Sequence, residues 1–336
     1  MSSKNHRILY IRTDRIGDVL MNLPAIRLLR QTFPKSWIAV MLDAPVAELL
    51  KDHPDIDEIL PIAADEFKKK FGYRLNLTRK IKKIGFDLAV ASNPDKFIHA
   101  LLFFSRIPRR VGYDRKWAFF LNRKMWCKKN ECPTHEIQKN LSLVKLISEK
   151  VWDQSADLPV NGFERNRIEA LLKKEGLAER PFVVVHAGTS NPQKRWPEDR
   201  FARLCDQIQL DLNLKVVLIG GEEEIGSSKK VAAQSHVPLI DWTGRLSLSR
   251  LVALFHRPEV RLLVSSDSGP AHIAWISGIP AVVMYAKNVP GSDPGRWGPL
   301  DSKSEVIFKP IHEIAVEEVY EAAKRIIQTN RALRGA

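Results

Sequence analysis

The sequence predicts an α/β protein with two domains, each built around a parallel β-sheet. The chain has 336 residues, enough for two domains of ordinary size. Short runs of β-branched and other apolar residues alternate with stretches whose apolar residues recur every three or four positions, as in strand–helix repeats. The strand segments are continuously apolar, which is typical of parallel sheets covered by helices on both faces.

Four strands are expected in the first half. They are residues 8–11, 37–42, 59–62 and 86–91. A helix is expected to begin near Asp18, with Pro24 one turn in, and another covers 137–150 by its apolar spacing. A break follows near 151–162, which contains Pro159 and Gly162.

The strand–helix pattern then restarts. The expected strands are 182–186, 215–220, 261–265 and 281–285, and the expected helices are 198–210, 223–234, 247–256 and 270–277. We therefore predict two Rossmann-like domains, 1–158 and 159–336. A last helix, about 313–329, could pack back on the first domain. Because ligands of open parallel sheets bind at the carboxyl ends of the strands, candidate site residues are expected there.

Composition narrows the class of protein. Hydrophobic residues make up 44% of the chain and charged residues 27%, which excludes a disordered chain or a disulfide-rich scaffold. No apolar run approaches the roughly 18 residues of a membrane-spanning helix, and the N-terminal apolar stretch is too short for a signal peptide. Three cysteines fit a reducing compartment, so we expect a cytoplasmic protein. Cys127, Cys132 and His135 supply only three zinc ligands, so no metal is expected.

Charge is unevenly distributed. The net charge is +14, from 53 Lys and Arg against 39 Asp and Glu. Residues 1–160 carry 29 basic and 18 acidic residues, a net of +11, and residues 161–336 carry 24 and 21, a net of +3. Segment 101–130 holds nine basic residues and one acidic residue. The positive electrostatic field of such a region attracts nucleic acid, an anionic membrane surface or a phosphorylated substrate.

The first candidate site residues follow the first strand, in the segment RTDRIGD, residues 12–18. Gly17 would permit a tight turn and a close backbone approach to a ligand. Asp18 would act as a general base toward a hydroxyl, or cap the following helix, and from this segment alone the cap is the simpler interpretation. The segment lacks the Gly-x-Gly-x-x-Gly fingerprint, which argues against a dehydrogenase.

A second candidate lies in the loop HAGTSNPQKRWP, residues 186–197, after an expected buried strand. Its backbone N–H groups, the hydroxyl of Thr189 and the charge of Lys194 suit a phosphate or diphosphate. An ordinary polar surface loop is the alternative. The length and polarity of the loop beside a buried strand favour the functional interpretation.

A third candidate is the acidic run GGEEE, residues 220–224, after another expected strand. A carboxylate just past a strand end suits the two hydroxyls of a ribose. Three acids that open a helix are also expected from the helix dipole alone. Both interpretations stay open at this point.

The fourth candidate is the strand-to-helix segment SSDSGPAH, residues 265–272. Ser268, Gly269 and the free N–H groups of the helix would form an anion site stabilised by the helix dipole. Asp267 would cap the helix or bind a sugar hydroxyl. His272, taken alone, is better explained as a core histidine.

In this order, the segments resemble glycosyltransferase family 9, the ADP-heptose:lipopolysaccharide heptosyltransferases. The family pattern has Gly-Asp and a Pro after the first strand, a His-x-x-Thr loop leading to Lys-x-Trp, Thr-Gly with Ser-Leu, and Asp-(Ser/Thr/Gly)-Gly-x-x-His. The matching residues are Gly17, Asp18 and Pro24; His186, Thr189, Lys194 and Trp196; Thr243, Gly244, Ser247 and Leu248; Asp267, Ser268, Gly269 and His272. An Arg-x-Gly segment at Arg110 and the pair His135-Glu136 also fit. The likeness spans nearly the whole chain.

The resemblance implies a GT-B fold, in which two Rossmann-like domains face each other across a cleft. It implies metal-independent, inverting transfer of a heptose from ADP-heptose to the lipid A-linked inner core of lipopolysaccharide, with no cofactor beyond the donor. Asp18 becomes the base that deprotonates the acceptor hydroxyl. Lys194, Thr189 and the helix start at residues 268–269 would stabilise the leaving diphosphate.

Other donor contacts also follow from the resemblance. Glu223 matches the ribose-binding acid best, with Glu222 second. Asp267 would hold the transferred sugar, and Thr243, Gly244 and His272 complete the expected donor-binding residues.

The basic first domain fits an anionic glycolipid acceptor at the inner face of the cytoplasmic membrane. The expected acceptor-binding residues are Gly17, Arg109, Arg110 and Arg115. Basic residues of segment 103–124 interleave with aromatic residues, and these side chains would dock on that surface. The protein is accordingly expected to be a peripheral membrane protein and a monomer. A solvated basic face is the alternative.

One loop departs from the family pattern. After the strand 281–285 the family usually reads Gly-Pro-Thr-Asp-Pro, whereas this chain reads AKNVPGSDPGRW, residues 286–297. The sugar or the acceptor could therefore differ from the standard core heptose. A GT-B protein that binds a nucleotide-sugar without transfer is a second interpretation, against which the retained Asp18, Lys194 and Asp267 argue. A nucleic-acid-binding protein is a third, but no reader module is recognisable.

Overall fold

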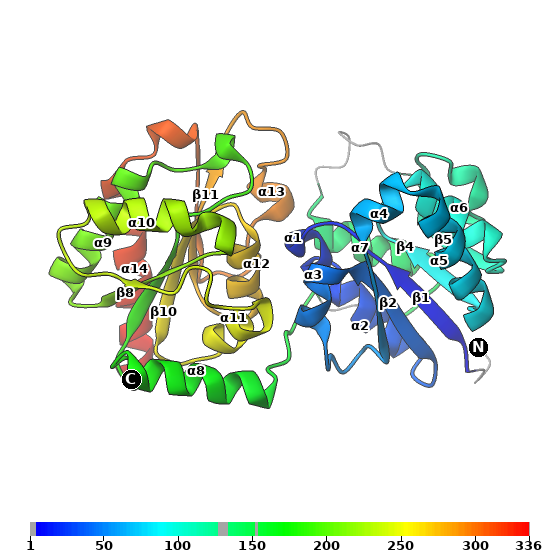
Figure 1. Cartoon of the computed structure of the whole chain (residues 1–336), viewed down its shortest axis with the longest axis horizontal. Helices are drawn as coiled ribbons and strands as arrows, with labels where there is room; N and C mark the ends of the chain where they lie inside the picture. The colour runs from blue at the N-terminus through cyan, green and yellow to red at the C-terminus, as the bar shows by residue number, and fades with distance from the viewer. Residues whose placement is uncertain (1–4, 127–133, 152–153, 336) are drawn as a thin grey trace. The chain divides into compact units, whose positions relative to one another are not determined.

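The computed structural model of the chain describes residues 5–126, 134–151 and 154–335 (Figure 1). The chain divides into two compact units, Met1–Pro159 and Val160–Ala336. Each unit contains one six-stranded sheet, and all the described neighbouring strands run parallel. The predicted α/β class with two parallel sheets is confirmed.

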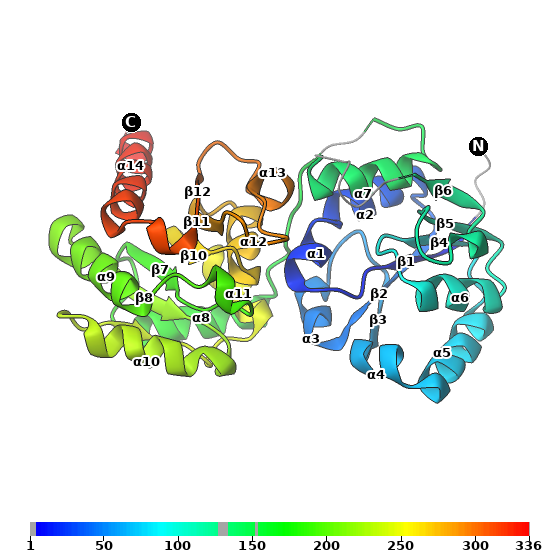
Figure 2. The ribbon, with the colours of Figure 1, turned by 90° about the horizontal axis from the view of Figure 1, so that it is seen from above.

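The first unit has the strand order β3-β2-β1-β4-β5-β6. Its strands are β1 Arg7–Ile11, β2 Trp37–Asp43, β3 Glu58–Ile62, β4 Leu88–Ala91, β5 Arg109–Tyr113 and β6 Arg123–Met125. Its helices are α1 Ile16–Leu20, α2 Leu23–Thr32, α3 Ala44–Ala47, α4 Ala64–Lys69, α5 Phe71–Ile84, α6 Lys96–Phe104 and α7 Glu136–Lys145, with 3-10 turns η1 Glu48–Leu50 and η2 Ala118–Phe120. Helices α4, α5 and α6 cover one face through apolar side chains such as Phe67, Ile81 and Leu101, and α2 and α7 lie on the other (Figure 2).

The second unit has the strand order β12-β11-β10-β7-β8-β9. Its strands are β7 Phe182–His186, β8 Lys215–Ile219, β9 Ile240–Asp241, β10 Val260–Ser266, β11 Ala281–Ala286 and β12 Glu305–Lys309. Its helices are α8 Gly162–Lys174, α9 Glu198–Leu212, α10 Ile225–Gln234, α11 Leu248–Phe255, α12 Gly269–Ile276, α13 Pro294–Trp297 and α14 Val316–Gly335, with 3-10 turns η3 Pro192–Lys194, η4 Glu222–Glu224 and η5 Ile311–Glu313. Val319, Ala323 and Ile327 place one face of α14 in the core of this unit, where it packs on the unit's own sheet.

The structure corrects two expectations. The helix expected near Asp18 is two helices, because α1 ends at Leu20 and α2 begins at Leu23. The sheets are also larger than predicted, since the sequence pattern missed β5, β6, β9 and β12.

The strand orders locate the best places for ligands. In the first sheet the chain runs outward from β1 through β2 to β3 and then returns to β4 on the other side of β1. The second sheet has the same reversal between β7 and β10. Ligands of open α/β sheets bind beyond the carboxyl ends of the strands at such reversals.

Candidate functional site

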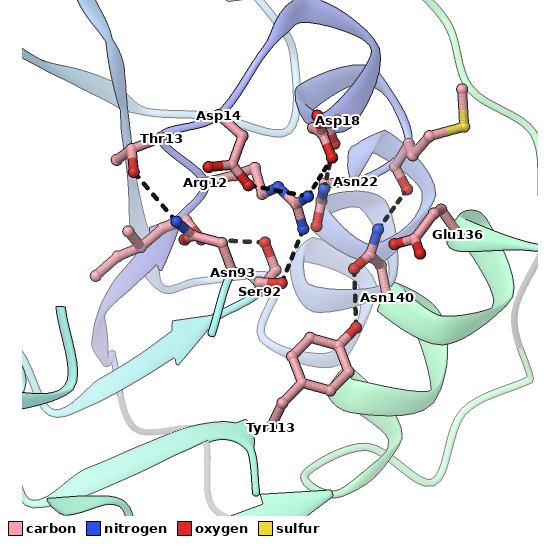
Figure 3. Close-up of polar contacts among 12 residues, drawn as sticks. Arg12, Thr13, Asp14, Asp18, Asn22, Ser92, Asn93, Tyr113, Glu136 and Asn140 are labelled. Carbon is pink, nitrogen blue, oxygen red and sulfur yellow. Dashed lines mark hydrogen bonds and ion pairs between the residues drawn. The ribbon is translucent and has the colours of Figure 1, made fainter. Parts of the chain in front are cut away.

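A buried polar cluster occupies the carboxyl ends of β1 and β4 (Figure 3). Arg12 follows β1 and is 7% exposed. Its Nη1 donates to the carbonyl of Ser92, after β4, at 2.8 Å. Its Nη2 donates to Asp18 Oδ1 and lies 3.1 Å from Asp14 Oδ2. Arg12 therefore connects the two strand ends to two carboxylates.

Asp18 lies inside α1, not at its N-cap. Arg15 occupies the cap position, so the capping interpretation is wrong. The Asp18 carbonyl accepts from Asn22 Nδ2 at 2.6 Å, and Asn22 Oδ1 accepts from the Tyr10 hydroxyl at 2.6 Å. Gly17 is a buried residue of the same helix, so it does not make the expected tight turn.

The pKa of the Asp18 carboxyl is raised above its ordinary value. Burial is the largest cause, and the nearby carboxylates of Asp14 and Glu136 add to the rise. The charge and hydrogen bond of Arg12 oppose it. A carboxylate whose pKa is moved toward neutrality is better matched to taking a proton from a hydroxyl.

Helix α7 completes the cluster. Glu136, buried at its first position, lies 3.2 Å from Lys139 Nζ. Asn140 Oδ1 accepts from the Tyr113 hydroxyl at 3.1 Å. The sequence prediction did not include Arg12 or Asn140, although the strand-end position of Arg12 was a usable signal.

The expected acceptor-binding arginines are split between two ends of the sheet. Arg109 and Arg110 open β5, whereas Tyr113 ends it and faces the polar cluster. Four residues of strand span about 13 Å. The structure therefore does not bring Arg109 and Arg110 to Asp18, while Arg115 follows the carboxyl end of β5 and lies at the same end of the sheet as Asp18.

In the second unit, two expected donor-binding residues pair with each other. Lys194 Nζ, in η3 after β7, lies 2.6 Å from Asp267 Oδ2, directly after β10. It also donates to the Gly291 carbonyl at 3.3 Å. The two side chains thus converge from neighbouring strand ends. An anion bound by Lys194 would compete with Asp267 for the same ammonium group.

A chain of hydrogen bonds, the relay, crosses the ends of β8, β7 and β10. Glu224 Oε2 lies 3.0 Å from His186 Nε2, and His186 Nδ1 lies 3.0 Å from Ser265 Oγ. Ser265 Oγ lies 2.8 Å from Ser268 Oγ. His186 is 2% exposed. The relay connects the acidic run to the N-terminus of α12.

Glu224 is the acid of the run that turns inward. Its Oε2 also accepts from the Gly221 N–H at 2.9 Å. Burial raises the pKa of Glu224, but the contacts with His186 and the Gly221 N–H, together with the charge of Arg195, outweigh it, so the pKa is lowered. Glu222 and Glu223, which the sequence analysis favoured, are exposed.

Glycine at position 188 makes room for this carboxylate. A Cβ built on Gly188 would lie 1.8 Å from Glu224 Oε1, a distance at which two atoms cannot coexist. The relay therefore depends on a glycine two residues after β7. The sequence analysis named this glycine only as part of a polar loop.

The N-terminus of α12 is capped by Ser268. Its hydroxyl accepts from the Ala271 N–H at 3.4 Å, and Gly269 is the first helical residue. Thr189 is buried in the loop after β7, where its Oγ1 accepts from the Asn191 N–H at 3.3 Å. Backbone N–H groups at such a helix start favour an anion.

Three other expected donor residues make internal contacts. Thr243 Oγ1 donates to Ser228 Oγ at 2.8 Å, and Gly244 has a φ of 73°, a left-handed turn that favours glycine. His272 is buried, accepts from the Trp275 indole N–H at 3.4 Å and places Nε2 3.8 Å from Asp267 Oδ1. These contacts fit the core-histidine interpretation and give Thr243 a structural role.

Six aromatic rings form a second feature of the first unit, the aromatic patch. Its members are Phe97, Phe103, Phe104, Trp117, Phe119 and Phe120. Phe104 is 60% exposed and Phe119 70% exposed. Cations lie over the rings: Arg74 is 4.1 Å and Lys96 4.8 Å from the centroid of Phe97, and Arg110 is 5.4 Å from that of Phe103.

The described residues hold neither a metal-binding cluster nor a membrane-spanning helix. Within residues 5–126, 134–151 and 154–335, no three His, Cys, Asp or Glu side chains are grouped as a metal would require. Cys127 and Cys132 of the weak zinc motif lie outside the described residues. No described helix combines the length and apolar character needed to cross a bilayer.

Comparison with known proteins identifies the family and supports the fold. The sequence model of glycosyltransferase family 9 (heptosyltransferase) matches residues 74–324. Lipopolysaccharide heptosyltransferase 2 of Escherichia coli K12 is 25% identical over 314 residues, covering 90% of this chain and 87% of that protein. A family 9 crystal structure from Veillonella parvula superposes with a TM-score of 0.85 at 21% identity, covering 98% and 99% of the two chains. The structure of E. coli ADP-heptose lps heptosyltransferase II gives 0.80 at 22% identity, with 97% and 99% covered.

Proposed function

The chain belongs to glycosyltransferase family 9 and has a GT-B fold, and on this premise we propose that it transfers a heptose from ADP-heptose to the inner core of lipopolysaccharide. Heptosyltransferase relatives that align with nine-tenths of the chain support the reaction. The name of the E. coli structural neighbour, an ADP-heptose lps heptosyltransferase, supports the donor.

Asp18 is the general base of the proposed reaction. It takes the proton of the acceptor hydroxyl while that oxygen forms a bond to the anomeric carbon of the heptose. The bond from this carbon to the β-phosphate oxygen of ADP breaks at the same time, and ADP leaves with the electron pair. Attack opposite the leaving group inverts the anomeric configuration. The observation that carries this role is a buried carboxylate, with a raised pKa, at the strand reversal of the first unit.

The second unit binds the donor. Lys194 exchanges Asp267 for the diphosphate, and the N-terminus of α12 at Ser268 provides further positive potential. These groups supply the charge that a metal supplies in other glycosyltransferases, so the proposed reaction is metal-independent. Asp267, once released, accepts from hydroxyls of the heptose, and the acidic run at Glu223 and Glu224 faces the ribose.

The first unit docks on the acceptor's membrane. Exposed rings of the aromatic patch enter the interface, and Arg74, Lys96 and Arg110 meet anionic headgroups at the inner face of the cytoplasmic membrane. The protein acts there as a peripheral monomer.

A transfer assay tests the proposal. The chain is incubated with ADP-heptose and a heptose-free inner-core acceptor, without added metal and then with a chelator. We expect ADP release and a mass increase of one heptose on the acceptor, and none with Asp18→Asn. Hydrolysis of ADP-heptose without a heptosylated acceptor would contradict the proposal.

A different nucleotide-sugar is the second candidate donor. The segment 286–297 departs from the family pattern, and its Gly291 carbonyl contacts Lys194. A thermal-shift screen of nucleotide-sugars decides between donors, because the ligand that binds the native state raises the melting temperature.

A further inference from the structure

Arg12 is a charged residue of the first unit that the proposed chemistry leaves without a role. It is 7% exposed and comes directly after β1, six positions before Asp18. A guanidinium withdrawn from water is destabilising unless it is paired and hydrogen-bonded. Packing alone is therefore a weak reason for an arginine here.

The contacts of Arg12 define a fixed fork. Nη1 is anchored to the carbonyl of Ser92 at 2.8 Å, at the end of a sheet strand. Because the guanidinium is planar, this bond sets the direction of Nη2, which donates to Asp18 Oδ1. A lysine carries a single ammonium group and cannot reproduce both directions.

The charges that face Asp18 come from three elements. Arg12 faces it from the end of β1, Asp14 from the loop before α1, and Glu136 from α7. Glu136 is itself paired with Lys139, and Tyr113 of β5 faces Arg12. Burial raises the pKa of Asp18, and Asp14 and Glu136 raise it further, whereas Arg12 lowers it. Loss of Arg12 would therefore raise the pKa of Asp18 further.

We propose that Arg12 is a positioning residue, whose guanidinium keeps the Asp18 carboxylate charged and aligned to take the acceptor's proton. This proposal rests on the proposed role of Asp18 as the base. Arg12 acts through Asp18 and makes no contact with the reacting atoms.

The test compares kcat across pH for Arg12→Gln, Arg12→Lys and Asp14→Asn. Arg12→Gln lowers kcat at neutral pH at least tenfold, moves the acid limb of the profile to higher pH, and recovers activity at alkaline pH. Asp14→Asn removes a like charge and moves the limb to lower pH. Arg12→Lys keeps the limb near its wild-type position but lowers kcat at least fivefold, because the fork is lost. The KM for the donor stays unchanged in all three.

A measurement independent of turnover separates this proposal from the proposed function. The Asp18 carboxyl is followed in the full-length protein by 13C NMR titration, with its signal assigned by Asp18→Asn. Its midpoint should rise in Arg12→Gln and fall in Asp14→Asn. If Asp18→Asn remains active, the base role fails, whatever the midpoints are. If Asp18→Asn is inactive but Arg12→Gln keeps the wild-type limb and midpoint, the positioning role is overturned alone. Should Arg12→Gln fail to fold, a wild-type kcat in Arg12→Lys would overturn it.

Discussion

The two units have the same kind of sheet but carry side chains of opposite charge at the carboxyl ends of the strands. In both, polar side chains gather at the carboxyl ends of parallel strands beside the reversal in strand order. In the first unit, burial raises the pKa of Asp18, and neighbouring carboxylates raise it further. In the second, the ammonium group of Lys194 and the N-terminus of α12 converge on one place. One site is suited to receive a proton, and the other to bind an anion.

This contrast shows that the strands provide the place and the residues after them provide the chemistry. Strands β1 and β7 each have five residues, all of them buried except Arg7 at the start of β1. Strand β1 leads into a short helix that carries an acid, whereas β7 leads into a polar loop that carries a lysine. A variant of one unit should therefore change one half of the reaction and leave the other half intact.

The largest expected effect belongs to the first unit. Asp18→Asn should lower kcat by a factor of about 10²–10⁴, the usual contribution of a general base. Donor affinity, measured by calorimetry with free ADP and ADP-heptose, should stay within about twofold of wild type. Asp14→Asn removes an acid of the same cluster but not the base, so it should shift the pH profile without a comparable loss of kcat at neutral pH. A fall in kcat of less than about tenfold would give Asp18 a structural role only.

The second unit should respond in the opposite way. Lys194→Ala removes a charged hydrogen-bond donor, worth about 1.5–3 kcal/mol, so the affinity for free ADP should fall about 10- to 100-fold. Turnover should fall as well, because the charge also meets the transition state. The acceptor KM should not change. Lys229→Ala, an exposed lysine of α10, is the control; equal affinities for all three proteins would remove Lys194 from the donor site.

A smaller effect is expected for membrane binding, which should depend on the first unit and not on the second. Replacing Phe104 and Phe119 by serine removes two exposed rings of the aromatic patch, and liposome binding should weaken about tenfold. The acceptor KM should rise in parallel, and added salt should weaken the remaining binding. Phe163→Ser is the control, because Phe163 is 62% exposed but belongs to the second unit. Liposome binding that survives the double change would leave the patch an ordinary exposed face.

Sequence patterns anticipated the central strands because buried parallel strands are continuously apolar. They missed the outer ones for a physical reason. Strand β6 is Arg123–Met125, three residues of which two are charged, and β9 has only two residues. Such short strands receive their hydrogen bonds from a neighbour in space, and no local pattern records that.

The candidate site was predictable to the same extent. Lys194 and Asp267 could be expected to meet, because carboxyl ends of parallel strands share one edge. Arg109 and Arg110 were grouped with Arg115 because they are near in sequence, but the direction of β5 puts them at the other end of the sheet. Glu224 could not be chosen from three adjacent acids, since the choice depends on the space left at Gly188.

The smallest expected effect tests the relay by its pH dependence. The pKa of Glu224 is lowered in the folded protein, since the contacts with His186 and Gly221 outweigh burial. A carboxyl of this kind stabilises the fold above its unfolded pKa, and the stabilisation is lost as pH falls through the folded pKa.

The variant Glu224→Gln keeps the shape of the side chain but not its charge. Its free energy of unfolding at neutral pH should be about 1.5–3 kcal/mol below wild type, a typical loss for a hydrogen bond to a charged group. The difference should shrink as the pH falls below about 4, the ordinary range of a glutamate. The exposed neighbour Glu223→Gln should match wild type at every pH. If the difference in free energy of unfolding did not depend on pH, Glu224 would act through its shape alone, and its charge would not stabilise the relay.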